Sequence, residues 1–396
     1  MTVDEPPEDE QVVPPPDQVE PQPFRAFLAY FLGLGTWGFG GPIATVGYMQ
    51  RDLVERRKWL DREAFLNGVA LGQTTPGPLA AQVTMWVGYL QRGALGALLI
   101  SIPFILPSFL LVLGVAVLYA RYQGLDVVQD LFYGIAPAVM AVIAIASVKL
   151  ARLTNGADRR LWAISLVLLV VTAITGAEIA VLFVAAGLLM IVIEAPPSWL
   201  RLPHHAAIVP MLGAEGPWLV AVPDGGTLIA LGLFFFKAGA FIFGSGLAIV
   251  PFLRDGVVHD HHWLTEDQFL DAVAMGLITP GPVVITATFV GYLVGGFPGA
   301  FIATAAIFTP IYLGVVIPGR WFIRHRRNPQ LQAFVKGATA AAAGAIAGAV
   351  IILTQDAVID WTTAAIAIVA LVLLWRWKVR EPYMVLLGAL AGVALH

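Results

Sequence analysis

One segment of the chain occurs twice. Residues 35–84 align with residues 239–288 at a constant shift and without a gap. Both copies keep the same spacing between a Phe-Gly pair, a Trp-Leu pair and a Thr-Pro-Gly-Pro sequence. A duplication of this length predicts two halves of equivalent fold, because matching residues need matching surroundings.

The composition places both halves in a lipid bilayer. Of the 396 residues, 58% are hydrophobic and only 12% are charged, about half the charged share of a soluble protein. The chain has no cysteine, which excludes thiolate metal sites, and it has no basic stripe of the kind that binds nucleic acid. We therefore expect a bilayer as the surroundings, no nucleic-acid partner, no metal and no cofactor.

Four regions follow from the composition along the chain. Residues 1–23 are acidic and rich in proline and contain no Lys or Arg, which predicts a disordered tail and not a secretory signal. Residues 24–194 and 226–396 are the two predicted transmembrane repeats, and residues 195–225 join them as a linker. The oligomeric state is left open, with a homodimer among the alternatives.

Each half carries about five apolar runs long enough to cross about 30 Å of hydrocarbon. Between the first and second run lie an amphipathic stretch, a Pro-Gly-Pro break and a short apolar segment that ends near Tyr89 or Tyr292. This order predicts a broken helical hairpin that enters and leaves on one side. The predicted fold class is an all-α polytopic membrane protein. The runs begin near residue 24 and lie at 94–120, 127–150, 160–175 and 177–194, then at 226–244, 297–319, 330–353, 358–375 and 381–395.

The basic residues distinguish the two sides of the membrane. The basic loop at 51–62 aligns with a loop that contributes only Arg254, whereas the nearly uncharged turn at 175–177 aligns with a basic one at 376–380. Cytoplasmic loops concentrate Lys and Arg, so matching loops should face opposite sides. The halves are therefore predicted to be inverted-topology repeats, with both termini outside and the linker inside.

Two irregular points interrupt the apolar sequence of each half. In both halves a Thr-Pro-Gly-Pro element predicts a helix N-terminus inside the membrane, with threonine as the cap and proline in the first turn. Gly40, Gly41 and Pro42 predict another helix start in the first half, echoed less perfectly by Gly244, Ser245 and Gly246 in the second. Free N–H groups and about half a positive charge at such an end suit an anion. The alternative is that the glycines only allow close helix packing.

The predicted substrate-binding residues surround these breaks. They are Gly40, Gly41, Gln73, Thr75, Gly77, Gln82, Lys237, Gly244, Ser245, Thr279 and Gly281, and the structural helix breaks are Pro42, Pro76, Pro78, Pro280 and Pro282. The hydroxyls of Thr84, Thr286 and Thr288 are further candidates, with bonds to helix carbonyls as the alternative. Lys237 lies inside an apolar run, where a charge costs at least about 2.5 kcal/mol. It is therefore an anion ligand, a paired cation or a snorkelling side chain.

Catalytic groups do not cluster in the sequence. Acids within the apolar runs are scarce, and Asp130, Glu178 and Asp271 sit near the boundaries of the runs, so we expect no dedicated proton relay. We predict no enzymatic activity and no catalytic residue, and keep an intramembrane enzyme or a non-transporting membrane protein as the less favoured alternative. Broken helices repeated in two membrane halves favour a transporter.

The doubled motif resembles the chromate ion transporter family, in particular its long two-half chromate efflux permeases. The resemblance covers nearly the whole chain after the acidic tail. The second half departs from the pattern, with Ser245 in place of Gly41, and Leu277 and Ile278 in place of Gln73 and Thr74. The matching residues are Phe39, Gly40, Gly41, Trp59, Leu60, Phe65, Gln73, Pro76, Gly77, Pro78, Phe243, Gly244, Trp263, Leu264, Phe269, Pro280, Gly281 and Pro282.

The resemblance implies export of chromate across the inner membrane, with resistance to chromate as the consequence. The expected mechanism is alternating access of the two halves around the anion, driven by membrane potential. Sulfate or another oxyanion is the alternative substrate, because a pocket of N–H donors distinguishes tetrahedral dianions poorly.

Overall fold

The computed structural model describes residues 23–38, 41–122, 126–175, 180–196, 226–242, 249–319, 321, 328–377, 379 and 381–395. Within these ranges the chain forms helices and no strand. Nearly all of the predicted tail and of the predicted linker lies outside the described residues, as do Gly40, Gly244 and Ser245.

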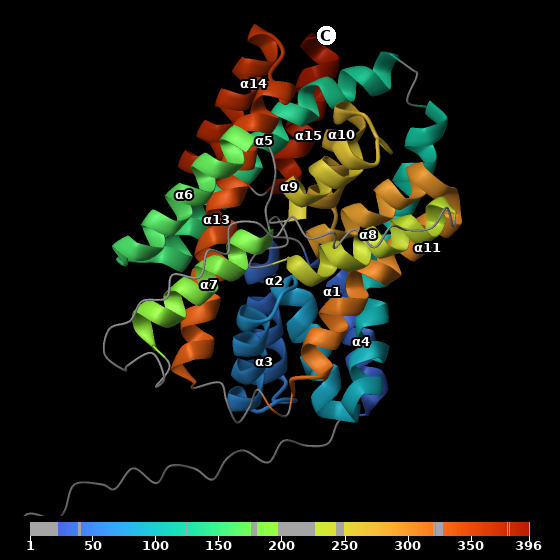
Figure 1. Ribbon diagram of the computed structural model, residues 1–396. Helices are drawn as coiled ribbons and strands as arrows, with labels where there is room; N and C mark the ends of the chain where they lie inside the picture. Colours follow the sequence, from blue (N-terminus) through green and yellow to red (C-terminus); the bar gives the residue numbers. More distant parts are fainter. Residues whose placement is uncertain are drawn as a thin grey trace, which may run out of the picture.

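The two halves contain matching series of helices (Figure 1). The first half consists of α1 (Phe24–Trp37), α2 (Gly41–Met49), the π-helix η1 (Gln50–Arg56), α3 (Arg62–Thr74), α4 (Leu79–Tyr122), α5 (Asp126–Asn155), α6 (Arg159–Thr175) and α7 (Ala180–Glu194). The second half consists of α8 (Thr227–Phe241), α9 (Ile249–Arg254), the π-helix η3 (Asp255–Asp260), α10 (Glu266–Ile278), the 3-10 turn η4 (Val283–Ile285), α11 (Thr286–Val316), α13 (Pro329–Ala357), α14 (Trp361–Val372), the π-helix η5 (Leu373–Trp377) and α15 (Glu381–Leu395).

The repetition extends to irregular backbone. Lys58 and His262, at matching positions, both have a φ of 51°. Inside α4, Gly93 has φ 60° and ψ −149°, and Gly296 inside α11 has the same two angles. Because these angles describe the backbone, their agreement means that the two halves repeat the same backbone fold as well as the same sequence pattern.

The breaks inside α4 and α11 divide each into a short arm and a long arm. The short arms end at Arg92 and Gly295, within three residues of the ends predicted at Tyr89 and Tyr292. The chain then folds back on itself, because a Cβ atom on Gly88 would collide with the carbonyl of Gly96. Glycine at both positions therefore permits the antiparallel contact of the two arms.

Four helices within the described ranges are long and apolar enough to cross a membrane by length and composition. These are Leu79–Tyr122, Gln129–Asn155, Val283–Val316 and Pro329–Ala357, two in each half. The remaining apolar helices, such as Val181–Glu194 and Glu381–Leu395, are shorter. The chain is thus a multi-pass helical membrane protein, and the number of crossings in each half stays a prediction.

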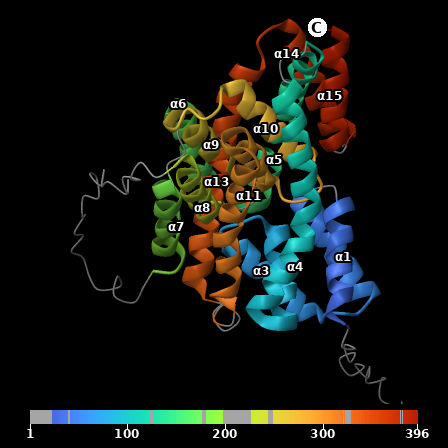
Figure 2. The same ribbon diagram turned by 90° about the vertical axis from the view of Figure 1, so that its right-hand side faces the viewer.

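The two halves exchange partners. The long helix α5 of the first half packs against α14 and α15, whereas its counterpart α13 packs against α6 and α7. The helices α4 and α11 also pack against each other. Figures 1 and 2 show the consequence, with α1 and α3 toward one end of the molecule and α14 and α15 toward the other.

Small residues allow these exchanged contacts. A Cβ on Gly134 would collide with the carbonyl of Gly388 in α15, and one on Gly337 would collide with the carbonyl of Ala186 in α7. The run from Ala340 to Ala345 in α13 is almost fully buried. Close backbone approach through small residues is the usual means of helix association in a membrane.

Candidate functional site

The helix that precedes each Thr-Pro-Gly-Pro break, α3 or α10, begins at a side-chain cap. The carboxylate of Asp61 accepts a hydrogen bond of 3.0 Å from the Ala64 N–H at the start of α3. At the start of α10, Thr265 and Gln268 form a reciprocal capping box. In both halves a side-chain cap therefore sets the start of the helix that leads to the Thr-Pro-Gly-Pro break.

The threonine of each break ends the preceding helix. The Thr75 hydroxyl donates to the carbonyl of Leu71 at 2.9 Å, and the Thr279 hydroxyl donates to the carbonyl of Gly276 at 3.1 Å. The prediction that Thr75 caps the following helix is wrong. Its backbone is extended, and its hydroxyl bonds back to α3 because the next helix begins only at Leu79.

The glycine of each break has a backbone conformation that side chains disfavour. Gly77 has a φ of 139° and Gly281 a φ of 127°. After Gly77 the chain turns into α4, and the carbonyl of Pro78 accepts hydrogen bonds from the N–H groups of Ala81 and Gln82 at 3.0 and 3.1 Å. A helix N-terminus therefore follows the break, as predicted, but the helix starts one residue after Pro78.

Gln82 ties the first break to the helix that follows it. Its side-chain N–H₂ group donates to the Thr75 carbonyl at 3.1 Å, to the Thr75 hydroxyl at 2.9 Å and to the Pro76 carbonyl at 2.9 Å. The side chain is fully buried, and its Oε1 atom has no partner among the described residues. The amide donors of Gln82 are thus engaged by the loop, and its predicted role as an anion ligand stays a prediction.

Each break contacts the opposite half. A Cβ on Gly77 would lie 2.9 Å from the Ile311 Cγ2 atom in α11, and one on Gly281 would collide with the Ser108 hydroxyl in α4. Ser108 and Ile311 occupy matching positions in the two halves. The N–H of Gly77 also donates to the carbonyl of Ile242 at 2.6 Å. These cross-half contacts, called the central contact below, place each break against a residue of the opposite half.

The earlier break is only partly described. The helix α2 begins at Gly41, with Pro42 in its first turn, as the sequence predicts. The helix α1 ends at Trp37 and is followed by Gly38, whose N–H donates to the carbonyl of Leu34 at 2.7 Å. In the second half, α8 ends before Ile242, so the matching break lies beyond the described residues.

The additional hydroxyls bond within the protein. Thr84 donates to the carbonyl of Ala80 at 2.8 Å, and Thr286 donates to the carbonyl of Val283 at 2.9 Å. Thr288 shares a hydrogen bond of 2.7 Å with Thr304. Thr84 and Thr286 therefore follow the alternative prediction, in which the hydroxyl bonds to a helix carbonyl.

Two predicted polar ligands lie apart from the buried break residues. Gln73 and Lys237 are both exposed, and the Lys237 ammonium sits 5.8 Å from the centre of the Phe252 ring. No described contact joins either side chain to the central contact. Their roles as substrate ligands stay predictions.

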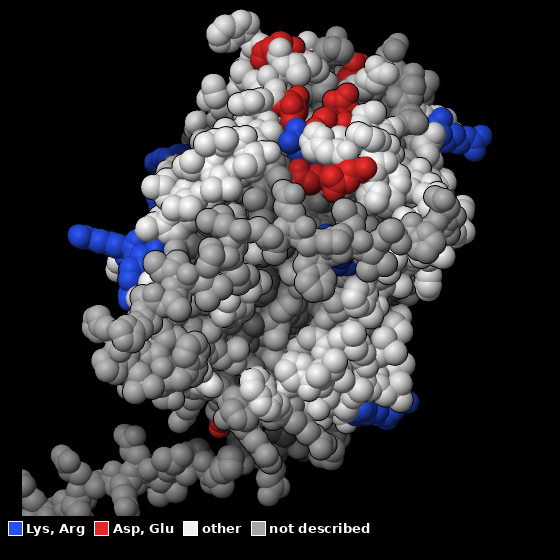
Figure 3. All heavy atoms as spheres, viewed as in Figure 1, with Lys and Arg blue, Asp and Glu red and all other residues white. Residues whose placement is uncertain are grey.

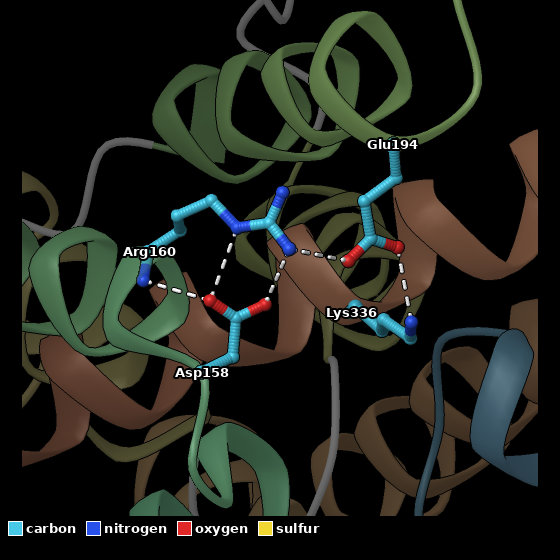
Figure 4. Close-up of polar contacts among 4 residues, drawn as sticks. All are labelled: Asp158, Arg160, Glu194 and Lys336. Carbon is cyan, nitrogen blue, oxygen red and sulfur yellow. Dashed lines mark hydrogen bonds and ion pairs between the residues drawn. The ribbon is translucent and has the colours of Figure 1, made fainter.

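Ion pairs mark the two ends of α13. Near its start, Lys336 pairs with Glu194 of α7 at 3.0 Å, and Glu194 also contacts Arg160 at 3.4 Å (Figure 4). Near its end, Asp356 pairs with Arg254 of α9 at 2.8 Å. Lys336 and Asp356 are separated by about 30 Å along the helix axis at 1.5 Å per residue, which equals the thickness of the hydrocarbon core.

The ion-pair network around Arg254 is the more buried of the two. Arg254 is 8% exposed, and it pairs with Glu266 at 2.7 Å as well as with Asp356. Figure 3 shows acidic side chains gathered on this part of the surface, over α9 and α10, around a basic one. At the other end, the guanidinium of Arg160 lowers the pKa of Asp158 by donating hydrogen bonds to its carboxylate.

The sequence analysis did not single out Ser108, Ile311 or Ile242. For Ser108 and Ile311 the signal lies in the sequence that follows the ungapped repeat. The sequence Val-Gly-Tyr-Leu occurs at residues 87–90 and again at 290–293, one residue short of the earlier shift. Continuing the alignment with that single gap pairs Ser108 with Ile311.

Comparison with known proteins gives one family. The chromate transporter family model matches residues 25–192 and residues 229–393. The chromate transport protein of Cupriavidus metallidurans is 49% identical over 375 residues, which cover 94% of this chain and 93% of that protein. The probable chromate transport protein of Synechococcus elongatus is 47% identical over 376 residues, covering 93% and 95%.

A more distant relative also aligns over nearly the full length. The chromate transport protein of Pseudomonas aeruginosa is 31% identical over 400 residues, covering 97% of this chain and 93% of that protein. No solved structure matches the chain. The division of the family match falls between the two helical series described above.

Proposed function

The chain belongs to the chromate transporter family, and we propose on this premise that it exports chromate from the cytoplasm across the inner membrane. Relatives that align over more than nine-tenths of the chain are named as chromate transport proteins. We assign the same substrate class, a tetrahedral oxyanion with two negative charges, to this chain.

The observation that carries the proposal is the central contact. Two helix breaks lie inside the protein, and each touches a residue of the opposite half. Irregular backbone at membrane depth is tolerated where it lines a protein cavity. The helix N-termini that follow Pro78 and Pro282 supply N–H donors and partial positive charge for an anion.

The exchanged packing supports an alternating-access mechanism. Because Gly77 meets Ile311 and Gly281 meets Ser108, a rotation of one half against the other changes both contacts together. In an inverted repeat, opening one side then closes the other around a fixed anion site. The charge asymmetry of matching loops supports the inverted orientation.

Membrane potential provides sufficient energy for export. Moving two negative charges out of a negative interior gains about 4.6 kcal/mol per 100 mV, which corresponds to more than three decades of concentration ratio. Export therefore needs no coupling ion in principle, whereas import of the same ion does.

Labelled chromate uptake into inverted membrane vesicles tests the proposal. Inverted vesicles carrying the protein should accumulate chromate, and uptake should rise when the vesicle interior is made positive. Vesicles without the protein are the control. Uptake that equals this control overturns chromate transport, and uptake that ignores the potential overturns the potential-driven mechanism.

Sulfate is the second candidate substrate, because chromate and sulfate share shape and charge. Unlabelled sulfate added to the same vesicles gives the distinction. If sulfate competes at concentrations equal to those of chromate, the site selects the class of anion and not the element.

A further inference from the structure

Asp271 is a buried carboxyl group shared between the two halves. It lies on α10 in the second half and is 7% exposed. Tyr119, near the end of α4 in the first half, donates a hydrogen bond of 2.7 Å to its Oδ2 atom. The ion pairs found among the described residues do not include Asp271.

Asp271 lies between the ion-pair network around Arg254 and the central contact. The helix α10 begins at Glu266, which pairs with Arg254, and ends at the Thr279 break. At 1.5 Å per residue, Asp271 is about 7 Å beyond Glu266 and about 12 Å before Thr279 along the axis. A proton held at Asp271 thus sits on the helix that leads from the surface to the break.

Among the described residues, the groups around Asp271 offer it no free cation. Asp267 lies one turn earlier on the same helix and adds negative charge. The Tyr119 ring packs against Phe132 of α5 and Phe289 of α11, with ring centres 5.3 and 5.2 Å away. The titratable groups of the other elements that pack against α10 are Arg254 of α9, already paired with Glu266 and Asp356, Asp255, His259 and Asp260 of η3, Asp130, Tyr133, Lys149 and Arg152 of α5, Tyr292 and Tyr312 of α11, and Glu381 and Tyr383 of α15. Lys149 and Arg152 lie at least about 25 Å beyond Phe132 along α5 at 1.5 Å per residue, far from Tyr119 and Asp271.

An unpaired carboxylate in such surroundings is costly, so the group favours a bound proton while it is buried. The matching position of the first half holds Asn67, also buried at 8% exposure. An amide has the shape of a carboxylic acid but no exchangeable acidic proton. The ionisable group is therefore present in one half only, where a tyrosine of the other half meets it.

We propose that Asp271 binds and releases one proton in each transport cycle of this protein. The inference rests on the proposed transport function and adds a coupling ion to it. While the halves are in contact, the carboxylic acid stays protonated and accepts the Tyr119 hydrogen bond. When the halves separate on one side of the membrane, water reaches the carboxyl group, the O–H bond breaks, and the proton passes to water on that side. When the protein next opens to the opposite side, the carboxylate binds a proton from the water there before the following closure, so each cycle moves one proton across the membrane.

Purified full-length protein in liposomes tests this directly. The liposomes contain a pH-sensitive dye, the membrane potential is held at zero with potassium and valinomycin, and the pH is one at which chromate is fully deprotonated. A chromate gradient should then drive proton movement through the wild-type protein. Asp271→Asn should abolish that proton movement and retain labelled chromate exchange within about threefold of wild type. Asp267→Asn, an acid on the same helix, is the matched control and should keep both.

Two further variants distinguish loss of the acidic proton from loss of the folded protein. Tyr119→Phe keeps the acid and should retain proton movement with a displaced pH profile. If Asp271→Asn loses chromate exchange, Asp271→Glu decides the matter: return of exchange together with proton movement supports the proposal, and loss of both overturns it.

The outcomes separate this inference from the proposed function. Absence of chromate and sulfate exchange in the wild type refutes transport itself. Exchange without proton movement in the wild type, proton movement that persists in Asp271→Asn, or a requirement for sodium in place of protons overturns only the role of Asp271.

Discussion

Ser108 of α4 donates a hydrogen bond from its hydroxyl to the carbonyl of Pro280 in the opposite half. The matching residue of the second half is Ile311, whose side chain has no hydrogen-bond donor. The first break is held instead by the N–H of Gly77, which donates to Ile242 at 2.6 Å. The two breaks are therefore alike in backbone and different in polar chemistry, so substitutions in the two halves should have unequal effects.

Gly77→Ala should abolish transport. Its φ of 139° disfavours a side chain, and the new Cβ would lie 2.8 Å from the Gln82 Nε2 atom and 2.9 Å from the Ile311 Cγ2 atom. Strain of this kind costs about 1–3 kcal/mol. Chromate uptake by vesicles, normalised to protein in the membrane, measures the effect. Gly33→Ala, where a Cβ meets nothing within 4 Å, is the control, and equal uptake by both variants would contradict the prediction.

Gln82→Leu should loosen the first break. The change removes three hydrogen bonds to Thr75 and Pro76 and leaves two half-buried carbonyls without that partner, at a cost of about 1–3 kcal/mol. Thermal unfolding in detergent should shift to lower temperature, and transport should fall. Thr84→Val is the control, because the Thr84 hydroxyl donates to its own helix at 2.8 Å and otherwise makes only a long contact of 4.0 Å with the Met49 sulfur, not with the break. A normal unfolding temperature for Gln82→Leu would show that the amide does not hold the loop.

Arg254→Gln should destabilise the protein more than removal of an exposed arginine. Arg254 is 8% exposed, and its loss leaves the carboxylates of Glu266 and Asp356 without their cation. We expect a loss of about 1.5–3 kcal/mol, typical of hydrogen bonds to charged groups. Arg51→Gln removes an exposed pair with Asp52, which contributes about 0–1 kcal/mol. Unfolding temperatures of the two variants give the comparison, and equal shifts would argue against a structural role for the Arg254 network.

The contribution of Asp158 to stability should vanish in acid. Hydrogen bonds from Arg160 lower the pKa of Asp158 below its ordinary value. A folded-state pKa below the unfolded one means that the stabilisation is present above the unfolded pKa, near 4, and is lost as the pH falls through the folded pKa. Unfolding temperature measured from pH 7 downward should fall less steeply for Asp158→Asn than for the wild type. Parallel curves would mean that the pair contributes nothing.

Lys237→Ala should weaken the transport of both chromate and sulfate if the ammonium binds the anion. Lys237→Arg keeps the charge and should retain most of the flux. Initial rates over a range of anion concentrations distinguish a change in affinity from a change in turnover. Unchanged affinity and flux in Lys237→Ala would leave the contact with Phe252 as the only role that the structure describes for this side chain.

Much of the fold is predictable from the sequence, because the membrane imposes simple rules. Long apolar runs must become helices, and α5 and α13 lie close to their predicted ranges. The helix start at Gly41 and the turn at Gly77 follow from the conformational properties of glycine and proline. These features depend on local sequence, which a single chain reveals.

The contacts between elements were not predictable in the same way. Nothing near Thr75 indicates that its hydroxyl turns back to Leu71, since capping the next helix satisfies the same local rules. The burial of Asp271 depends on Tyr119, which lies 152 positions away in the chain. An acid near the end of an apolar run suggests a solvated boundary, and only the packing of the two halves makes it a buried group.

The exchange of partners between the halves has a consequence for biosynthesis. The helix α5 leaves the ribosome early, yet surfaces that cover it belong to α14 and α15, which are made more than 200 residues later. Until α15 has been made, the small-residue face around Gly134 lacks its partner at Gly388. A premature stop codon that removes only α15 should therefore disturb the first half as well, and quality-control proteases should degrade the whole nascent chain.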